Sequence, residues 1–259
     1  MSVCRRVHGG VLAAALAASC LLAAPGARAA GAWEYTAAIV APRASAAVAA
    51  VNGKVYVIGG RSNGVLKTTA VENSVEVYDP AANAWTPLAP KPTGVVNDEA
   101  GVIGGIIYVP GGGILEAYNP ATDTWAAKAA MPAVVSSGAV AGVGSKLYVL
   151  GGKVEGVVGG TCYVYDQPGN NWSTCAAMTF ARQSAGAAVI DGKIYVYGGD
   201  EGVYSASRDL ERYDPSSDTW TTLAHSGGFG WTGVGVVGYG GILYACGGSY
   251  RTWYPNPPG

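Results

Sequence analysis

A short phrase occurs five times in this 259-residue chain: a tyrosine, two further residues and then a pair of glycines. The five tyrosines are Tyr56, Tyr108, Tyr148, Tyr195 and Tyr244, and successive copies are 40 to 52 residues apart. A phrase that recurs at such a period is typical of repeat proteins, in which each repeat is one supersecondary unit that packs on its neighbours. The chain is therefore expected to fold as an array of similar units.

Each glycine pair is preceded by the signature of a hairpin. A two-residue turn stands just ahead of each of these tyrosines, and most of the turn pairs suit a tight turn, as in Asn52-Gly53 and Asp191-Gly192. Such pairs are typical of β-hairpins whose turn residues need a positive φ. A run of small apolar residues precedes each turn, so each repeat is predicted to open with two antiparallel strands.

A second phrase runs from a tyrosine to a tryptophan seven residues later. It occurs at Tyr78–Trp85, Tyr118–Trp125, Tyr165–Trp172 and Tyr213–Trp220. The Pro, Asn, Asp and Gly residues inside it favour a turn, so it predicts a second hairpin. Each repeat is therefore predicted to be a sheet of four antiparallel strands.

The spacing separates a rigid part of the repeat from a variable part. From each tryptophan to the tyrosine of the next glycine phrase there are 23 or 24 residues. From the second glycine to the next tyrosine the spacing ranges from 6 to 18 residues. Constant spacing indicates the scaffold, whereas variable spacing indicates surface loops that can carry function.

The glycine pair and the Tyr-to-Trp phrase together resemble the Kelch repeat over nearly the whole chain after its first 29 residues. This resemblance implies an all-β fold, a five-bladed Kelch-type β-propeller of four-stranded antiparallel blades. The last repeat lacks its tryptophan, whereas Trp33 precedes the first glycine phrase at the standard spacing. We therefore expect an N-terminal strand around Trp33 to complete the last blade and close the ring. Kelch propellers more often have six or seven blades, so a fragment of a longer propeller is the alternative.

The N-terminal residues are typical of an export signal. A short basic start is followed by an apolar run over residues 11–24 and a small-x-small cleavage pattern at residues 27–29. This predicts a signal peptide over residues 1–29, a Kelch propeller over residues 30–259, and a periplasmic or secreted protein. A lipoprotein attached at Cys20 is the less favoured alternative.

The charge balance argues against two classes of partner. Without the three arginines of the signal, 13 basic side chains stand against 17 acidic ones. We therefore expect no binding to nucleic acid or to an anionic membrane surface. No later apolar stretch is long enough to cross a bilayer, so no membrane span is expected.

The histidine count argues against metal chemistry. Kelch-like propellers include copper oxidases, whose metal needs two histidines and two tyrosines, but only His225 follows the signal peptide. A zinc site with several His or Cys ligands is disfavoured for the same reason. We expect no metal and no cofactor, and we favour a function other than catalysis.

A ring of small polar residues is the first candidate site. These residues lie twelve positions after each tryptophan, at Ser45, Asn97, Ser137, Ser184 and Thr232. In Kelch propellers the strand that starts here lines the central channel, so these groups are expected to hydrogen-bond a ligand. The alternative interpretation is that only small residues fit where the strands converge, with water satisfying their polar groups.

Charged loop residues are the second candidate. Arg61 and Asn63 follow the first glycine pair, where peptide-binding Kelch propellers place recognition groups. Arg182, Asp200 and Arg251 are expected on the same face, because the second strand of each blade ends where the first began. Arginines favour an acidic or carboxylate-bearing ligand. The opposite face consists of tight turns and is expected to leave little room for recognition.

These features favour a binding module that engages a protein segment or a glycan through its loop face. The alternative is a sugar-acid mutarotase or epimerase, similar to exported bacterial Kelch propellers that act on sialic acid. Its acid–base pair would come from Glu155, Asp200 and Glu201, and arginines would hold the carboxylate. This second hypothesis depends on fold analogy.

A disulfide is predicted between Cys162 and Cys175. Cys162 lies three residues before Tyr165 and Cys175 three after Trp172, so the two are opposed if the aromatic pair is opposed. The same positions hold apolar pairs in two other repeats, Val75 with Leu88 and Leu210 with Leu223. Export to an oxidising compartment favours the formation of this disulfide. Cys246 is expected to remain a buried thiol.

Overall fold

The computed structural model describes residues 35–62, 71–202, 206–225 and 230–249 of the chain. Every regular element in these ranges is a β-strand, and they contain no helix that is long and apolar enough to cross a membrane. The predicted signal peptide and Trp33 lie outside the described residues.

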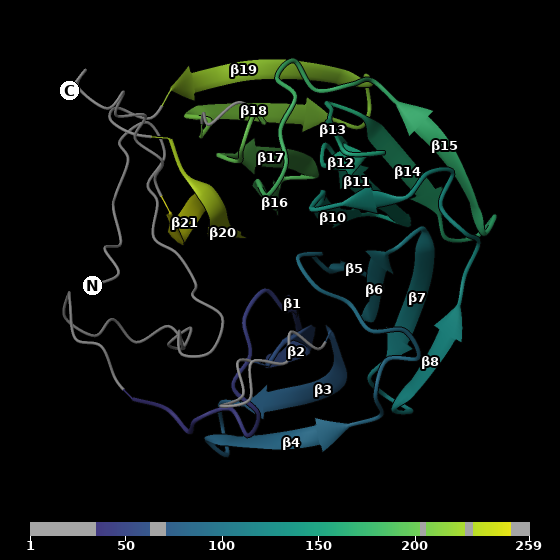
Figure 1. Ribbon diagram of the computed structural model, residues 1–259, viewed down its shortest axis with the longest axis vertical. Coiled ribbons are helices and arrows are strands. Elements are labelled where there is room, and N and C mark those ends of the chain that lie inside the picture. Colours follow the sequence, from purple (N-terminus) through teal and green to yellow (C-terminus); the bar gives the residue numbers. More distant parts are fainter. Residues whose placement is uncertain (1–34, 63–70, 203–205, 226–229, 250–259) are drawn as a thin grey trace, which may run out of the picture.

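Five sheets follow one another around a common centre, and we call them blades 1 to 5 (Figure 1). Blade 1 contains β1 (Ala47–Val51), β2 (Lys54–Arg61), β3 (Val71–Asp79) and β4 (Ala84–Leu88). Blade 2 contains β5 (Gly101–Ile103), β6 (Ile106–Gly111), β7 (Ile114–Asn119) and β8 (Thr124–Ala127). Blade 3 contains β10 (Ala139–Val143), β11 (Lys146–Leu150), β14 (Cys162–Asp166) and β15 (Asn171–Cys175). Blade 4 contains β16 (Gly186–Ile190), β17 (Lys193–Tyr197), β18 (Asp209–Asp214) and β19 (Thr219–His225).

Blade 5 has two described strands, β20 (Thr232–Tyr239) and β21 (Ile242–Ser249). A small extra sheet, formed by β9 (Val135–Ser136), β12 (Lys153–Val154) and β13 (Val157–Val158), adjoins blade 3. In each blade the first strand faces the centre, and in blades 1 to 4 the fourth strand lies at the rim (Figure 1).

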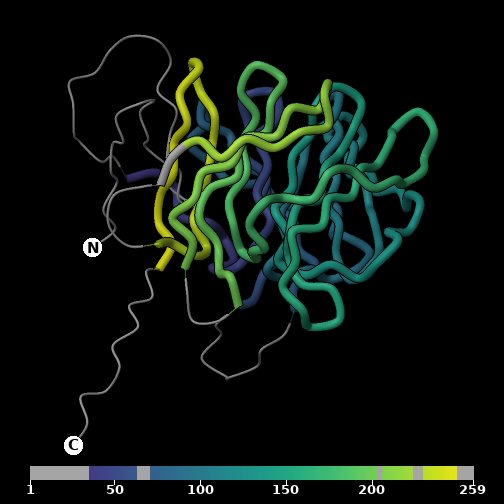
Figure 2. The backbone as a smooth tube through the Cα atoms, turned by 90° about the horizontal axis from the view of Figure 1, so that it is seen from above, coloured from purple at the N-terminus to yellow at the C-terminus, as the bar shows by residue number. Residues whose placement is uncertain are grey.

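The fold is thus an all-β, five-bladed propeller with antiparallel blades. The turn between β20 and β21, in yellow, points to one face of the ring, and the other ends of these strands lie at the opposite face (Figure 2). The expected closing strand around Trp33 falls outside the described residues. Tyr35 and Thr36, which would end it, belong to no strand.

The predicted hairpin turns are present. Asn52 and Gly53 between β1 and β2 have φ values of 51° and 75°, and Asp191 and Gly192 between β16 and β17 have 50° and 72°. Asn, Asp and Gly tolerate this left-handed region better than other residues, which explains their choice at these turns.

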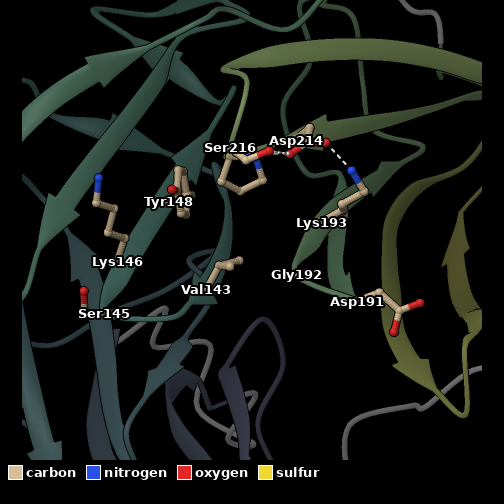
Figure 3. Close-up of a pocket in the computed structure, with 10 residues that line it drawn as sticks. Val143, Ser145, Lys146, Tyr148, Asp191, Gly192, Lys193, Asp214 and Ser216 are labelled. Carbon is tan, nitrogen blue, oxygen red and sulfur yellow. Dashed lines mark hydrogen bonds and ion pairs between the residues drawn. The ribbon is translucent and has the colours of Figure 1, made fainter.

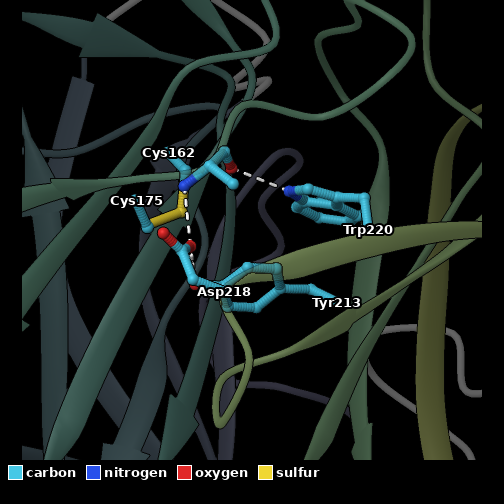
Figure 4. The surroundings of a disulfide bond; sticks show 6 residues. Cys162, Cys175, Tyr213, Asp218 and Trp220 are labelled. Atoms are coloured by element: carbon cyan, nitrogen blue, oxygen red, sulfur yellow. Dashed lines mark hydrogen bonds between the residues drawn. A yellow bond between two sulfur atoms is a disulfide. The ribbon is translucent and has the colours of Figure 1, made fainter.

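The Tyr-to-Trp phrase forms a latch between successive blades. In blade 4 the Tyr213 hydroxyl donates to Asp218 Oδ1 (2.6 Å), which also accepts the N–H of Ala176 (2.8 Å) (Figure 4). The indole N–H of Trp220 donates to the carbonyl of the same Ala176 (2.8 Å), and the Tyr213 and Trp220 rings lie 5.0 Å apart. Each outer hairpin therefore holds the segment that arrives from the blade before it.

Blades 1 to 3 contain the same latch. Its three residues are a linker alanine, a turn residue and a tryptophan. They are Ala37, Asn83 and Trp85 in blade 1, Ala89, Asp123 and Trp125 in blade 2, and Ala129, Asn170 and Trp172 in blade 3. The turn residues have φ values between 47° and 52°, which Asn and Asp adopt more readily than most other residues.

The glycine pairs allow the backbone of the next blade to pass close by. Gly59 and Gly60 have φ values of 64° and 101°, and the Gly60 N–H donates to the carbonyl of Val95 (2.7 Å). A Cβ atom on Gly59 would lie 2.6 Å from that carbonyl oxygen. A side chain at this position would therefore push the linker between blades 1 and 2 away.

The hydrophobic core lies between the blades. Each described cluster joins residues of successive sheets, and each contains a tyrosine pair that spans the junction. These pairs are Tyr56–Tyr118, Tyr108–Tyr165 and Tyr148–Tyr213, with ring centroids 6.1, 5.8 and 5.6 Å apart. Burial of these large rings makes each blade depend on its neighbour.

The predicted disulfide is confirmed. Cys162 and Cys175 are opposed in the β14–β15 pair and are bonded, with Cα atoms 5.1 Å apart (Figure 4). Val75 and Leu88 are opposed at the same place in blade 1, as expected. Cys246 keeps a buried thiol.

The predicted pairing of Leu210 with Leu223 is wrong. In blade 4 Glu211 lies opposite Thr222, and Leu210 lies opposite Ala224. Leu223 is therefore an extra residue in β19, a β-bulge, and its side chain is exposed. A bulge shifts the register of everything after it by one residue.

Candidate functional site

The ring of small polar residues forms the joints between blades at the channel. Ser45, Asn97, Ser137 and Ser184 all have left-handed φ values, between 51° and 57°. The N–H of Asn97 donates to the carbonyl of Ser45 (3.0 Å), and the N–H of Ser184 donates to that of Ser137 (2.8 Å). These residues therefore connect blades 1 and 2 and blades 3 and 4 through their backbones.

The fifth member of the ring is Gly233, not the predicted Thr232. The N–H of Gly233 donates to the carbonyl of Ser184 (2.9 Å), and Gly233 has a left-handed φ of 64°. Thr232 instead pairs with Ser249, as Gln183 pairs with Asp200 in blade 4. The bulge at Leu223 causes this displacement, because it adds one residue between Trp220 and the ring.

Side chains of the ring remain accessible. Ser45 and Asn97 are exposed, and Ser137 and Ser184 are half-buried. The left-handed backbone is a conformation that Asn and Gly tolerate better than bulky residues. It leaves the hydroxyl and amide groups of Ser45 and Asn97 open to solvent.

Charged residues that follow the glycine pairs occupy equivalent places beside the ring. Arg61 lies opposite Ala44, the residue before Ser45, and their backbones exchange two hydrogen bonds of 2.8 and 2.9 Å. Lys153 lies opposite Ser136, and Asp200 lies opposite Gln183. Arg61 is exposed, and its backbone lies beside the ring.

Lys153 was not among the predicted site residues. It directly follows the glycine pair of blade 3, as Arg61 follows that of blade 1, so this spacing could have identified it. Asp200 follows the pair in blade 4, but it is buried, and its carboxylate accepts the N–H of Gly202 (2.8 Å). Predicted residues Asn63 and Arg251 lie outside the described residues.

Arg182 differs from the expectation of an accessible cation. Its side chain is fully buried and forms an ion pair with Glu211 (2.6 Å). It also donates to the carbonyl oxygens of Gly198 (3.0 Å) and Asp209 (2.9 Å). Arg182 was expected on the loop face, but its guanidinium is buried in blade 4, so it is a structural residue.

Arg43 repeats this arrangement in blade 1. Its buried side chain pairs with Glu76 and donates to the carbonyl of Ser74 (2.9 Å). Glu76 and Glu211 both stand two residues before the tyrosine of the second phrase. The arginine two residues before a ring serine therefore forms a second kind of latch, which holds the incoming linker to the third strand of its own blade.

Two neighbouring carboxyl groups, Asp98 and Glu99, lie at the joint between blades 2 and 3. Asp98 accepts the N–H of Ser137, and Glu99 accepts the N–H of Val140 (3.0 Å). Burial raises the pKa of Asp98 to about 7, against the opposing effects of the Ser137 hydrogen bond and of Lys91. Burial also raises the pKa of Glu99 to about 8, and the Asp98 charge adds to this shift. These two residues directly follow the ring residue Asn97 in the sequence.

The Kelch motif profile matches residues 42–92, 136–179 and 181–226, which together make up more than half of the chain. The chain belongs to the Kelch motif family. This agrees with the repeat phrases and with the propeller that the structure shows.

Several Kelch proteins are similar to part of this Kelch chain. It is 35% identical over 80 residues to Kelch-like protein 33 of Homo sapiens and 34% identical over 82 residues to Kelch-like ECH-associated protein 1B of Danio rerio. The matches cover 31% and 32% of this chain but only 14% of either relative.

Among solved structures, that of YjhT is similar to this Kelch propeller. The TM-score is 0.74, the two sequences are 20% identical, and the match covers 84% of this chain and 81% of YjhT. At this level of identity the likeness shows a shared fold.

The turn face of this Kelch propeller is not as flat as the sequence predicted. A depression of about 510 Å³ lies there between the turns of blades 3 and 4 (Figure 3). Its lining residues are Val143, Ser145, Lys146, Tyr148, Asp191, Gly192, Lys193, Asp214, Pro215 and Ser216.

The polar groups of this depression are partly engaged with each other. Lys193 forms an ion pair with Asp214, which also accepts hydrogen bonds from the N–H (3.0 Å) and hydroxyl (2.6 Å) of Ser216. These contacts lower the pKa of Asp214, and the contact with Lys193 has the largest effect. In Figure 3 the labelled side chains of Lys146 and Asp191 point away from one another. They do not converge on a common point as the side chains of a preformed polar site would.

Proposed function

We propose that this Kelch protein is a binding module that engages a protein segment or a glycan on its ring face. The ring face comprises Ser45, Asn97, Ser137 and Ser184 together with Arg61 and Lys153. The observation that carries the proposal is the place of Arg61. Its β-bridge to Ala44 supports the proposal, because it brings the backbone of the exposed Arg61 beside the residue that precedes the exposed Ser45.

The chemistry of this face favours a ligand that bears a carboxylate. Guanidinium and ammonium groups bind carboxylates through charge-assisted hydrogen bonds, which are about twice as strong as neutral ones. The hydroxyl groups of Ser45 and Ser137 and the amide of Asn97 can both donate and accept, as sugar hydroxyls and peptide groups require. An acidic peptide segment or an acidic glycan meets both requirements.

We further propose that the protein acts outside the cytoplasm, as a periplasmic or secreted protein. The disulfide between Cys162 and Cys175 supports this, because such bonds persist mainly in oxidising compartments. The signal-like residues 1–29 point in the same direction.

The test compares the two faces of the propeller. A ligand is first found on arrays of acidic peptides and glycans, and its affinity is then measured for Arg61→Ala, Lys153→Ala and two turn-face variants, Lys54→Ala and Lys193→Ala. Loss of a charge-assisted bond should weaken binding by about 1 to 3 kcal/mol in the first two variants. If only the lysine changes at the turns weaken binding, the ligand occupies the turn face and the proposal is wrong.

The mutarotase hypothesis predicts a different result. Its candidate acids come from two blades, because Glu155 lies on the exposed β12–β13 turn next to blade 3, whereas Glu201 and the buried Asp200 lie in blade 4. We therefore place binding ahead of catalysis. Faster anomerisation of a sugar acid in NMR spectra, abolished by Glu155→Gln or Glu201→Gln, would replace the binding proposal with the enzymatic one.

A further inference from the structure

The joint between blades 2 and 3 is built differently from the other described joints of the ring. At three joints a backbone N–H of one ring residue donates to the backbone carbonyl of the preceding ring residue. Between blades 2 and 3 the N–H of Ser137 instead donates to the side chain of Asp98. Beside it, Glu99 accepts the N–H of Val140 at the start of β10 (3.0 Å).

The sequence makes this joint unique among the repeats. The residues equivalent to Asp98 and Glu99 are Ala46 and Ala47 in blade 1, Gly138 and Ala139 in blade 3, and Ala185 and Gly186 in blade 4. None of these side chains can accept a hydrogen bond. Ala47, Ala139 and Gly186 are buried, so Glu99 brings a carboxyl group to a position that is apolar in the other blades.

Asp98 and Glu99 are both half-buried at this joint. A Cβ atom on Gly111 of β6 would lie 2.9 Å from Asp98 Oδ2, so the carboxyl group rests on the backbone of its own blade. Among charged groups, Lys91 favours the charge of Asp98, and the charge of Asp98 disfavours that of Glu99. Lys91 is in turn bound to Glu116 of β7, so much of its charge is already balanced. From blade 3 the pair receives the neutral amides of Ser137 and Val140.

We propose that Asp98 and Glu99 form a proton-dependent joint, which holds blades 2 and 3 together while the carboxyl groups are protonated and loosens when both ionise. A protonated carboxyl group still accepts an N–H through its carbonyl oxygen, so the two hydrogen bonds survive protonation. Ionisation places negative charges on two consecutive, half-buried residues, and burial disfavours the charged form of a carboxyl group. Because Asn97 and Ser137 flank this joint, loosening it would change the distance between these two residues of the polar ring. The joint exists whether or not a ligand binds there.

The direction of the pH effect follows from the raised pKa values of about 7 and 8. In the unfolded chain both groups return to ordinary values near 4, so between about pH 4 and pH 8 the folded protein holds more protons than the unfolded chain. Its stability therefore falls as the pH rises through this window.

The experiment measures the thermal unfolding midpoint from pH 5.5 to 8.5 for the full chain and for the variant Asp98→Asn/Glu99→Gln. The amides keep the acceptor oxygens but cannot ionise. The variant should gain at least about 5 °C over the unaltered protein as the pH rises across this range. Asp191→Asn, which removes an exposed carboxylate on a turn, is the control and should follow the unaltered protein. A difference that does not change with pH overturns the proposal.

A second measurement locates the effect and does not require the variant to fold. Amide-exchange protection factors of Ser137 and Val140 in the unaltered protein should fall about tenfold or more between pH 5.5 and 8.5, relative to that of Ser184. Ser184 is the control because its N–H donates to a backbone carbonyl at the next joint. Equal changes at all three amides, or carbon-13 spectra in which no side-chain carboxyl titrates above pH 6, also overturn the proposal.

Discussion

Arg182 and Arg61 illustrate how one residue type has two different roles in this propeller. The guanidinium of Arg182 is fully buried and bonded to Glu211, Gly198 and Asp209, whereas Arg61 is exposed. Glu211 also accepts the N–H of Thr179 (2.9 Å), so it ties the incoming linker to β18. A buried carboxylate that loses its cationic partner has no water to replace it.

Arg182→Ala should therefore lower the free energy of unfolding by about 3 to 5 kcal/mol, because it leaves Glu211 buried and uncompensated. Arg61→Ala removes an exposed side chain and should change stability by no more than about 0.5 kcal/mol. Urea denaturation of both variants gives the two values. Equal effects would mean that burial does not distinguish the two arginines.

The outer hairpin is the element that connects one blade to the next. In blade 3 the side chain of Asn170 accepts both the hydroxyl of Tyr165 (2.8 Å) and the N–H of Ala129 (3.0 Å). Its φ of 47° allows the tight turn that brings Trp172 opposite Tyr165. One side chain thus shapes the turn and fastens the linker from blade 2.

Asn170→Ala should cost about 2 to 3 kcal/mol, since it removes both hydrogen bonds and places alanine in the left-handed region. Asn170→Asp is the matched control, because Asp occupies the equivalent position in blades 2 and 4. It should keep most of the stability at neutral pH in denaturant titrations. A loss from Asn170→Asp as large as that from Asn170→Ala would show that the acceptor oxygen is not what matters.

At the scale of the whole molecule, stability depends on how the ring is joined. Tyrosine pairs, latches and ring residues all connect one blade to the next, so an open edge would leave one side of a core exposed. Ala37 binds to blade 1 as Ala89 binds to blade 2, and each lies four residues after a tryptophan. This equal spacing supports the proposal that the segment around Trp33 completes blade 5 as Trp85 belongs to blade 1.

Deleting residues 30–36 leaves Ala37 and its contacts in place but removes Trp33. If the segment closes the ring, the truncated protein should unfold at a markedly lower temperature or aggregate through the exposed edge of blade 5. Calorimetry and size-exclusion chromatography measure these two outcomes. A monomer with an unchanged melting temperature would contradict closure through Trp33.

The sequence alone determined the repeat, its hairpins and the disulfide. These follow from local rules, because turn residues such as Asn52-Gly53 adopt the required φ whatever surrounds them, and opposed positions in a hairpin follow from counting outward from the turn. The place of Cys162 opposite Cys175 needed nothing more. The family resemblance was carried by the same local phrases.

The tertiary structure decided which polar groups are open to solvent. Counting from Trp220 selected Thr232 instead of Gly233. The spacing from Trp220 to the next glycine phrase is one residue longer than in the other repeats, but the sequence does not show that the extra residue forms a bulge in β19. Arg182 and Arg61 have the same charge, and only the packing of a linker on β18 makes one of them structural. The raised pKa values of Asp98 and Glu99 likewise depend on a neighbouring blade that lies close by in space but later in the chain. Burial and desolvation are properties of that packing, so the sequence defined the scaffold while the assembled ring defined the site.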